Sequence, residues 1–226
     1  MDGPRKFADR RSAGRRLAAE LAHLKSRNPL ILALPRGGVP VAYEVALALD
    51  AEMDLIFVRK LGAPGHEEFG IGAVVDGAEP QLVLNEDVIR QIAPTSQYIH
   101  QELQRQLAEI ERRRDAYMAG RKPISPKGRC VIVVDDGIAT GGTVKAALQG
   151  VKRNEPAHLV LAVPVAPRQV LDDLRKECDE VVVLETPEPF HAVGLHYTDF
   201  TQTPDSEVID IMARSYRGHQ VVSHGD

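Results

Sequence analysis

The chain has 226 residues, of which 43% are hydrophobic and 27% are charged, and its formal net charge is −4. This composition is typical of a folded domain and excludes a disordered or fibrous protein. The length suffices for one well-buried core with at most a small subdomain, and it is too short for two full domains.

The charge distribution and the cysteines narrow the class further. Residues 1–27 carry eight Lys/Arg against three acids. A basic arm for nucleic acid would have this composition, but we favour solvated helix faces. Cys130 and Cys178 lack the spacing of a zinc site or a disulfide framework. No run approaches the ~20 apolar residues needed to cross a bilayer, and the first residues lack the apolar stretch of a signal peptide. We therefore expect a cytoplasmic protein.

Apolar periodicity predicts alternating helices and strands at the start of the chain. Leucines at helical spacing predict an amphipathic helix within 7–25. Short apolar runs predict buried strands at 30–34 and 55–58, with a helix over 39–49 between them. Residues 59–70, RKLGAPGHEEFG, have glycines, a proline and no period, which predicts a loop.

The middle of the chain predicts a hairpin and a long helix. Two apolar runs, 71–75 and 81–84, predict a β-hairpin that turns at Asp76-Gly77. A helix with a strongly polar face is predicted over 95–118. It carries the run 112–114, three arginines, for which we favour a solvated face or an oligomer contact over contact with RNA or with ligand phosphates.

The second half repeats the alternation of strand and helix, which predicts an α/β fold with a doubly wound, mainly parallel sheet. The tail from 187 to 197 is irregular, and 204–216 predicts a final helix. The alternating elements are strands at 131–134, 159–163 and 181–184, and helices near 143–153 and 167–177.

Residues 131–143, VIVVDDGIATGGT, have the chemistry of a phosphosugar site between a strand and a helix. Ligands of open α/β sheets bind at the carboxyl ends of the strands. Small residues let backbone amides approach a phosphate, Thr140 and Thr143 add hydroxyl donors, and a helix N-terminus favours an anion. The carboxylates of Asp135 and Asp136 suit vicinal sugar hydroxyls, directly or through a metal. The two commoner phosphate motifs, GxxxxGK[ST] and GxGxxG, are absent.

The order of four apolar residues, two acids, two variable positions, a small residue and TGGT resembles the signature of type I phosphoribosyltransferases without departures. The resemblance covers roughly residues 7–212, and the blocks LPRGG, RKLGAP and DDGIATGGT look especially like uncharacterised bacterial members. It implies that family's α/β fold with a β-hairpin extension and a small C-terminal hood. We expect one domain over 1–226, with a core over 7–186 that includes a flexible loop at 59–70 and a helical insertion at 95–118, and a hood or tail over 187–216.

The resemblance also implies roles for residues of the phosphate loop and the acid pair. Asp135 and Asp136 would hold the ribose hydroxyls and would contact Mg²⁺ indirectly, through substrate or water. The 5-phosphate would lie on a loop made of Ala139, Thr140, Gly141, Gly142 and Thr143.

Two further loops would hold the pyrophosphate. Leu34-Pro35-Arg36-Gly37-Gly38 resembles the family's pyrophosphate loop, with Arg36, Gly37 and Gly38 as the expected contacts. The segment 59–70 corresponds in order to the family's catalytic loop, in which Lys60, with Arg59 behind it, would neutralise the departing pyrophosphate.

The acceptor would lie under the hood, near Phe190, Tyr197 and Phe200, although ordinary packing explains these aromatic residues equally well. The implied activity is Mg²⁺-dependent transfer of the phosphoribosyl group from phosphoribosyl pyrophosphate to a nitrogen acceptor, such as a nucleobase or a related heterocycle. A regulator of the same fold that senses this ligand without catalysis is the alternative, and the basic residues at 1–27 and 112–114 motivate it. A phosphoribosyl pyrophosphate synthetase is disfavoured because no nucleotide-triphosphate motif is present. The expected partners are the two substrates and a second copy of the chain, with neither nucleic acid nor membrane.

Overall fold

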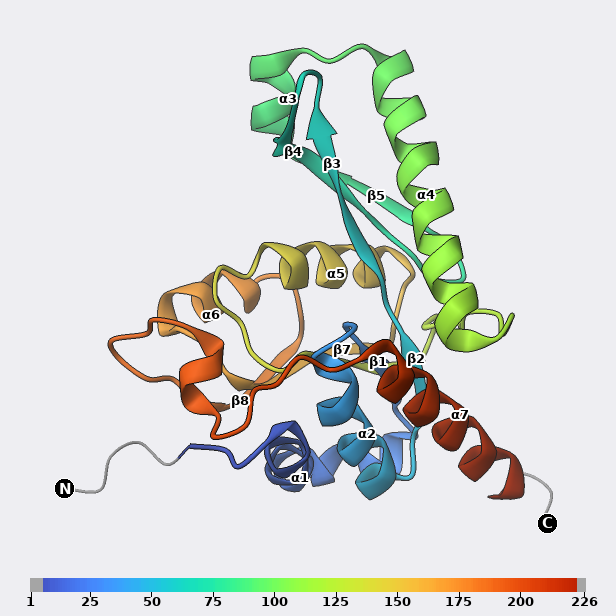
Figure 1. Ribbon diagram of the computed structural model, residues 1–226, viewed down its shortest axis with the longest axis vertical. Coiled ribbons are helices and arrows are strands. Elements are labelled where there is room, and N and C mark those ends of the chain that lie inside the picture. Colours follow the sequence, from blue (N-terminus) through green and yellow to red (C-terminus); the bar gives the residue numbers. More distant parts are fainter. Residues whose placement is uncertain (1–5, 223–226) are drawn as a thin grey trace.

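The computed structural model describes residues 6–222, which form a five-stranded parallel sheet and a separate antiparallel arm (Figure 1). The strand order in the parallel sheet is β2-β1-β6-β7-β8. This confirms the doubly wound α/β fold. The strands of this sheet are β1 Leu30–Ala33, β2 Glu52–Leu55, β6 Cys130–Val134, β7 His158–Val165 and β8 Glu180–Glu185.

Helices cover both faces of the parallel sheet, so its strands are apolar on both sides. In β6, Ile132 and Val134 belong to the core beneath the first two helices, whereas Val131 and Val133 belong to the core beneath the next pair. A strand buried on both faces needs such a continuous apolar run. The first face carries α1 Arg10–Glu20, the 3₁₀ helix η1 Ala22–Arg27 and α2 Gly38–Leu49, and the second carries α5 Gly142–Arg153 and α6 Arg168–Leu174.

The arm corrects two expectations from the sequence. The segment 59–70 is not a loop, because β3 Val58–Ala63 and β4 His66–Val75 pair as a long hairpin. The expected strand at 55–58 instead spans the end of β2 and the start of β3. In this hairpin Gly62 pairs with Gly70, and Leu61 pairs with Gly72. The strands therefore lack the alternation of apolar and polar residues by which strands are recognised in a sequence.

The rest of the arm contains the predicted hairpin and one unpredicted helix. β5 Gln81–Leu84 pairs antiparallel with β4, as expected for the runs 71–75 and 81–84. α4 Ser96–Met118 confirms the long helix. α3 Glu86–Ile92 was not predicted; its apolar residues Val88, Ile89 and Ile92 are only partly buried against the core, and seven residues are too few to show a clear helical period.

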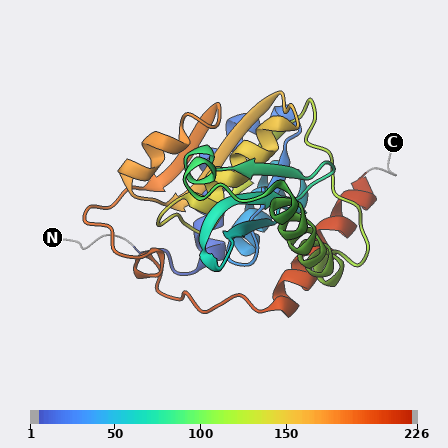
Figure 2. The same cartoon turned by 90° about the horizontal axis from the view of Figure 1, so that it is seen from above.

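After β8 come a tail, which packs against the segment before α1, and a helix, which packs against α4 of the arm. The tail contains a short 3₁₀ helix, η2 Val193–His196, and leads to α7 Asp205–Val222. Seen from above, α7 lies beside α4 (Figure 2). Within residues 6–222, none of the helices is long and apolar enough to cross a membrane.

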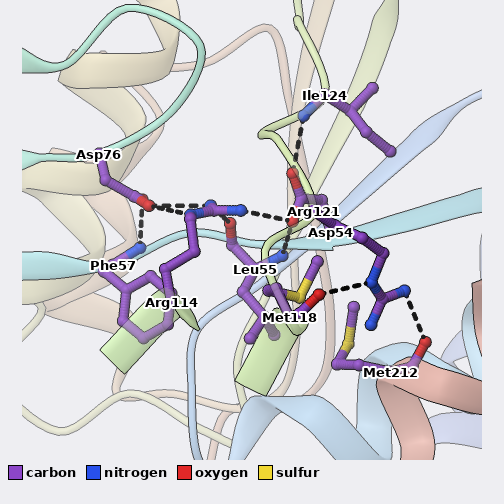
Figure 3. A network of polar contacts seen from close by, with 9 residues as sticks. All are labelled: Asp54, Leu55, Phe57, Asp76, Arg114, Met118, Arg121, Ile124 and Met212. Carbon is purple, nitrogen blue, oxygen red and sulfur yellow. Dashed lines mark hydrogen bonds and ion pairs between the residues drawn. The ribbon is translucent and has the colours of Figure 1, made fainter. Parts of the chain in front are cut away.

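A buried ion network joins α4 to the parallel sheet (Figure 3). Arg114 is only 8% exposed and donates to Asp54 Oδ1 at 3.0 Å, Asp76 Oδ2 at 2.8 Å and the Leu55 carbonyl at 2.6 Å. Asp76 also accepts a hydrogen bond from the Phe57 amide at 2.6 Å. A solvated face or an oligomer contact was expected for the run 112–114. For Arg114 this expectation is wrong, because its side chain is buried in the network.

Replacing Arg114 by Met is expected to destabilise the protein strongly, because it leaves two buried carboxyls without their cation. The loss should be about 3–5 kcal/mol at pH 8, measured by urea unfolding. Burial, partly opposed by Arg114, raises the pKa of Asp76 to about 6. A buried acid whose pKa is raised takes up a proton in the folded state below that value, so the loss should be smaller at pH 5. Arg105→Met, at an exposed α4 position, is the control; equal stability of the two variants at pH 8 would contradict the prediction.

Candidate functional site

The phosphate loop lies at the carboxyl end of β6 and has the conformation that its glycines allow. Gly137 and Gly141 have φ values of 157° and 79°, which favour glycine. The Ile138 amide donates to the Val165 carbonyl at 2.9 Å and fixes the loop to β7. The predicted contact residues Ala139, Thr140, Gly142 and Thr143 are exposed or partly exposed, so the amides around the N-terminus of α5 are accessible to an anion.

The loop after β1, whose peptide bond between Pro35 and Arg36 is cis, packs directly against the two acids. A Cβ atom at Gly37 would lie 2.0 Å from Asp136 Oδ2, and one at Gly38 would lie 2.8 Å from the Val134 carbonyl oxygen. Only glycine at position 37 therefore permits this approach, and the two predicted glycine loops meet at the acid pair.

Asp135 and Asp136 are partly buried side by side, and an arginine that the sequence did not single out binds the second of them. Arg10 Nε donates to Asp136 Oδ2 at 2.8 Å, and Arg10 Nη1 donates to the Thr201 carbonyl at 2.7 Å. Burial raises the pKa of both carboxyls; Asp136 adds to the increase at Asp135, and Arg10 opposes it at Asp136. Arg10 lies 126 residues from Asp136 in the chain, so no local pattern could have indicated it.

Two of the three aromatic residues expected at the acceptor instead support the acid pair. Tyr197 is 3% exposed, its hydroxyl donates to the Asp136 carbonyl at 2.5 Å, and its ring lies 5.3 Å from that of Phe7. The Arg10 guanidinium lies 4.0 Å from the centre of the Phe200 ring. In this conformation the Tyr197 ring has no exposed face for an acceptor.

Phe190, the third, lies at a cavity beyond the ends of β7 and β8. This cavity has a volume of about 410 Å³ and is also lined by Arg168, Gln169 and Glu188. The Phe190 ring stacks on His196 with their centres 5.4 Å apart. Phe190 therefore borders an open space that an acceptor could enter.

A second cavity, of about 440 Å³, lies between the loop after β1, the arm and α4. Asp135 and Thr143 border it on the side of the acid pair, and Asp205, the first residue of α7, borders it on the other. Arginines make up much of its charged wall, from the loop, from β3 and from α4. They are Arg36, Arg59, Arg112 and Arg113.

Arg59 and Lys60 do not face the same cavity. Successive side chains of a strand point to opposite faces, and β3 directs Arg59 toward the cavity that Arg36 also lines. Lys60 lines a different cavity of about 610 Å³, which Gly142 and Lys145 of α5 also border. The structure therefore brings Arg59 to the predicted pyrophosphate loop and Lys60 to the start of α5.

Magnesium is the cofactor that the resemblance implies. Among the side chains that the structure describes, no group of three or more His, Cys, Asp or Glu is arranged to hold a metal ion. Magnesium keeps several waters and often needs only one or two protein carboxylates beside substrate phosphates. Because Arg10 already pairs with Asp136, the two aspartates would supply few ligands to a metal ion. The pair therefore fits an ion that substrate and water hold for the most part.

Replacing Arg10 by Gln is expected to raise the pKa of Asp136, because the guanidinium favours the ionised carboxylate. The raised pKa means that the carboxyl should take up its proton at a higher pH than in the unchanged protein. A ¹³C NMR titration of the aspartate carboxyl signals measures this directly. Arg11→Gln, whose arginine pairs with Glu44, should leave the Asp136 titration unchanged. A shift of similar size in both variants would mean that Arg10 has no specific effect.

Comparisons with known proteins identify the family of the chain. Rv0571c of Mycobacterium tuberculosis, itself named a phosphoribosyl transferase only provisionally, is 44% identical over 211 residues, which are 93% of this chain and 47% of that protein. The chain thus spans about half the length of this relative. The crystal structure of TT1426 from Thermus thermophilus is 43% identical, with a TM-score of 0.81 over 92% of this chain and 98% of that one. The model of the phosphoribosyl transferase domain matches residues 10–198, a range that includes both glycine loops, the acid pair and Arg10, and the chain belongs to that family.

Proposed function

We propose that the chain transfers the 5-phosphoribosyl group of phosphoribosyl pyrophosphate to a nitrogen nucleophile and releases pyrophosphate. One observation carries the proposal: the loop after β1 and the loop after β6 meet at Asp136, where a Cβ atom on Gly37 would lie 2.0 Å from the carboxylate. Two anion-binding loops so close together suit a ligand with phosphates at both ends of one sugar. The proposal concerns this chain alone, which matches about half the length of the Mycobacterium tuberculosis relative.

Each end of the ligand has a proposed place. Residues 139–143 hold the 5-phosphate, and the carboxylates of Asp135 and Asp136 accept hydrogen bonds from the ribose hydroxyls. Arg36 to Gly38 and Arg59 hold the pyrophosphate. Magnesium, when bound, supplies positive charge that helps the pyrophosphate to leave.

The proposed reaction breaks the bond between C1 of the ribose and the pyrophosphate oxygen and forms a bond from C1 to the acceptor nitrogen. The bonding electrons leave with the pyrophosphate, and the acceptor nitrogen loses a proton. The protein positions both partners and stabilises the charge that develops on the leaving group. The acceptor, a nucleobase or a related heterocycle, is proposed to lie in the cavity that Phe190 borders. The reaction is proposed to occur in the cytoplasm.

The ion pairs of the basic N-terminal region weigh against a nucleic-acid-binding regulator. Arg11 and Arg15 pair with Glu44, and Arg16 pairs with Glu185. Residues 1–5, which belong to the basic stretch 1–27, lie outside the described part of the chain. A cationic surface whose charges are already paired attracts a polyanion less strongly.

The central test is a screen of nucleobases and related heterocycles with phosphoribosyl pyrophosphate and Mg²⁺, in which pyrophosphate release is measured. Turnover is expected with at least one acceptor, and Asp135→Asn/Asp136→Asn should reduce its rate at least about a hundredfold. Release of pyrophosphate by the double variant at the unchanged rate would refute the site. Binding of the ligand without any turnover would favour the regulator.

Gly37→Ala is expected to weaken binding of phosphoribosyl pyrophosphate at least about tenfold, because the new methyl group displaces Asp136. Isothermal titration calorimetry measures the change. Gly70→Ala is the control, because a Cβ atom there would meet only the Leu61 carbonyl, at 4.0 Å. Unchanged binding by Gly37→Ala would show that the contact between the loops is not needed.

A further inference from the structure

We infer that α4 forms part of the pyrophosphate site and that Arg112 and Arg113 bind the diphosphate together with Arg36 and Arg59. This inference rests on the proposed function. It gives the arm a direct role in ligand binding, because α4 belongs to the arm and not to the helices that cover the parallel sheet.

The fold brings the four arginines together. They come from three separate elements and line one cavity, which the loop Leu34 to Arg36 borders on one side and Asp135 borders on another. The carboxylates in the same wall are those of Asp135 and Asp205, so the arginines outnumber the acids. A cavity with this excess of guanidinium groups next to a sugar site suits a multiply charged anion.

The two α4 arginines are held by the same glutamate. Glu109 accepts hydrogen bonds from Arg112 Nε at 2.9 Å and Nη2 at 3.0 Å, and from Arg113 Nε at 2.7 Å. These bonds, first of all the one from Arg112, lower the pKa of Glu109 to about 2, so the carboxylate stays ionised. Each guanidinium has five N–H donors. The glutamate therefore orients both arginines while donors remain for a ligand.

The wall between α4 and the loop already holds an acidic group. Asp205 accepts hydrogen bonds from Arg36 Nη1 at 3.2 Å and from the Tyr117 hydroxyl at 2.7 Å. The hydrogen bond from Tyr117 and the charges of Arg36 and Arg113 lower the pKa of Asp205. The charges of Arg113 and Arg36 thus act on the same spot, where the anionic group is at present the carboxylate of Asp205.

The orientation of α4 is fixed by the next residue along the helix. Arg114 is bound within the buried network with Asp54 and Asp76. Adjacent residues of a helix point about 100° apart, so burying Arg114 turns Arg112 and Arg113 away from the core. The buried arginine therefore places its two neighbours at the cavity.

The test measures binding of inorganic pyrophosphate, phosphoribosyl pyrophosphate and ribose 5-phosphate by isothermal titration calorimetry. Arg112→Gln/Arg113→Gln should bind the two diphosphate compounds at least about tenfold more weakly, equivalent to about 1.4 kcal/mol. Binding of ribose 5-phosphate, which has no diphosphate, should change by less than about twofold. Arg112→Gln/Arg113→Lys, which keeps the charge at position 113, should recover part of the affinity that the double Gln variant loses.

The matched control is Arg105→Gln on the same helix. Arg105 pairs with Glu102 three residues earlier, as Arg112 pairs with Glu109, and its side chain is 57% exposed against 68% for Arg112. The Arg105→Gln variant should bind all three compounds as tightly as the unchanged protein does. Thermal unfolding checks that each variant is folded.

The outcomes separate the inference from the proposed function. If the unchanged protein binds phosphoribosyl pyrophosphate and the double variant binds both diphosphate compounds equally well, the role of α4 is refuted and the proposed function stands. Equal weakening of ribose 5-phosphate, or equal weakening in Arg105→Gln, also refutes a specific diphosphate contact. If the unchanged protein binds none of the three compounds, the proposed function itself is refuted, and the role of α4 with it.

Discussion

The contact between the loop after β1 and Asp136 is the constraint on which the candidate site depends. Gly37 lies so close to Asp136 that a methyl group could not fit between them. From other directions, Arg10 binds the carboxylate of Asp136 and Tyr197 binds its carbonyl oxygen. Elements from the beginning, middle and end of the described chain thus fix one aspartate. Burial raises the pKa of this acid, and Arg10 limits the increase, which favours the ionised carboxylate.

The arm is positioned by a different interaction, the ion network of Arg114. A buried ion pair adds little net stability, because taking the charges out of water is costly, but losing one partner is strongly destabilising. Asp54 belongs to β2, and Asp76 follows β4, so Arg114 ties α4 both to the parallel sheet and to the arm. This tie would explain how α4, outside the parallel sheet, keeps a fixed place beside the loop after β1.

Sequence patterns could predict the parts of the molecule whose cause is local. The strand, acids and glycines of 131–143 follow one another in the chain, and the core strands are continuous apolar runs. The hairpin of β3 and β4 could not be predicted, because it is held by pairing across Gly62 and Gly70 and not by an apolar period. Arg10 and Arg114 resemble any other surface arginine in the sequence. Their partners lie 126 residues away in one case, and 38 and 60 in the other, so only the fold identifies them.

The order of charges along the sheet edge connects these elements to the proposed ligand. The exposed amides and hydroxyls of the loop before α5 favour an anion. The next side chains along the edge, Asp135 and Asp136, are acids that suit neutral hydroxyl donors and would repel a phosphate. Beyond them lies the cavity with four arginines, which again favours an anion. A molecule with a phosphate at one end, hydroxyls in the middle and a diphosphate at the other end matches this sequence of sites in only one direction. That polarity would place C1 of the ribose at the border between the acids and the arginine cavity, where negative charge develops on the leaving group.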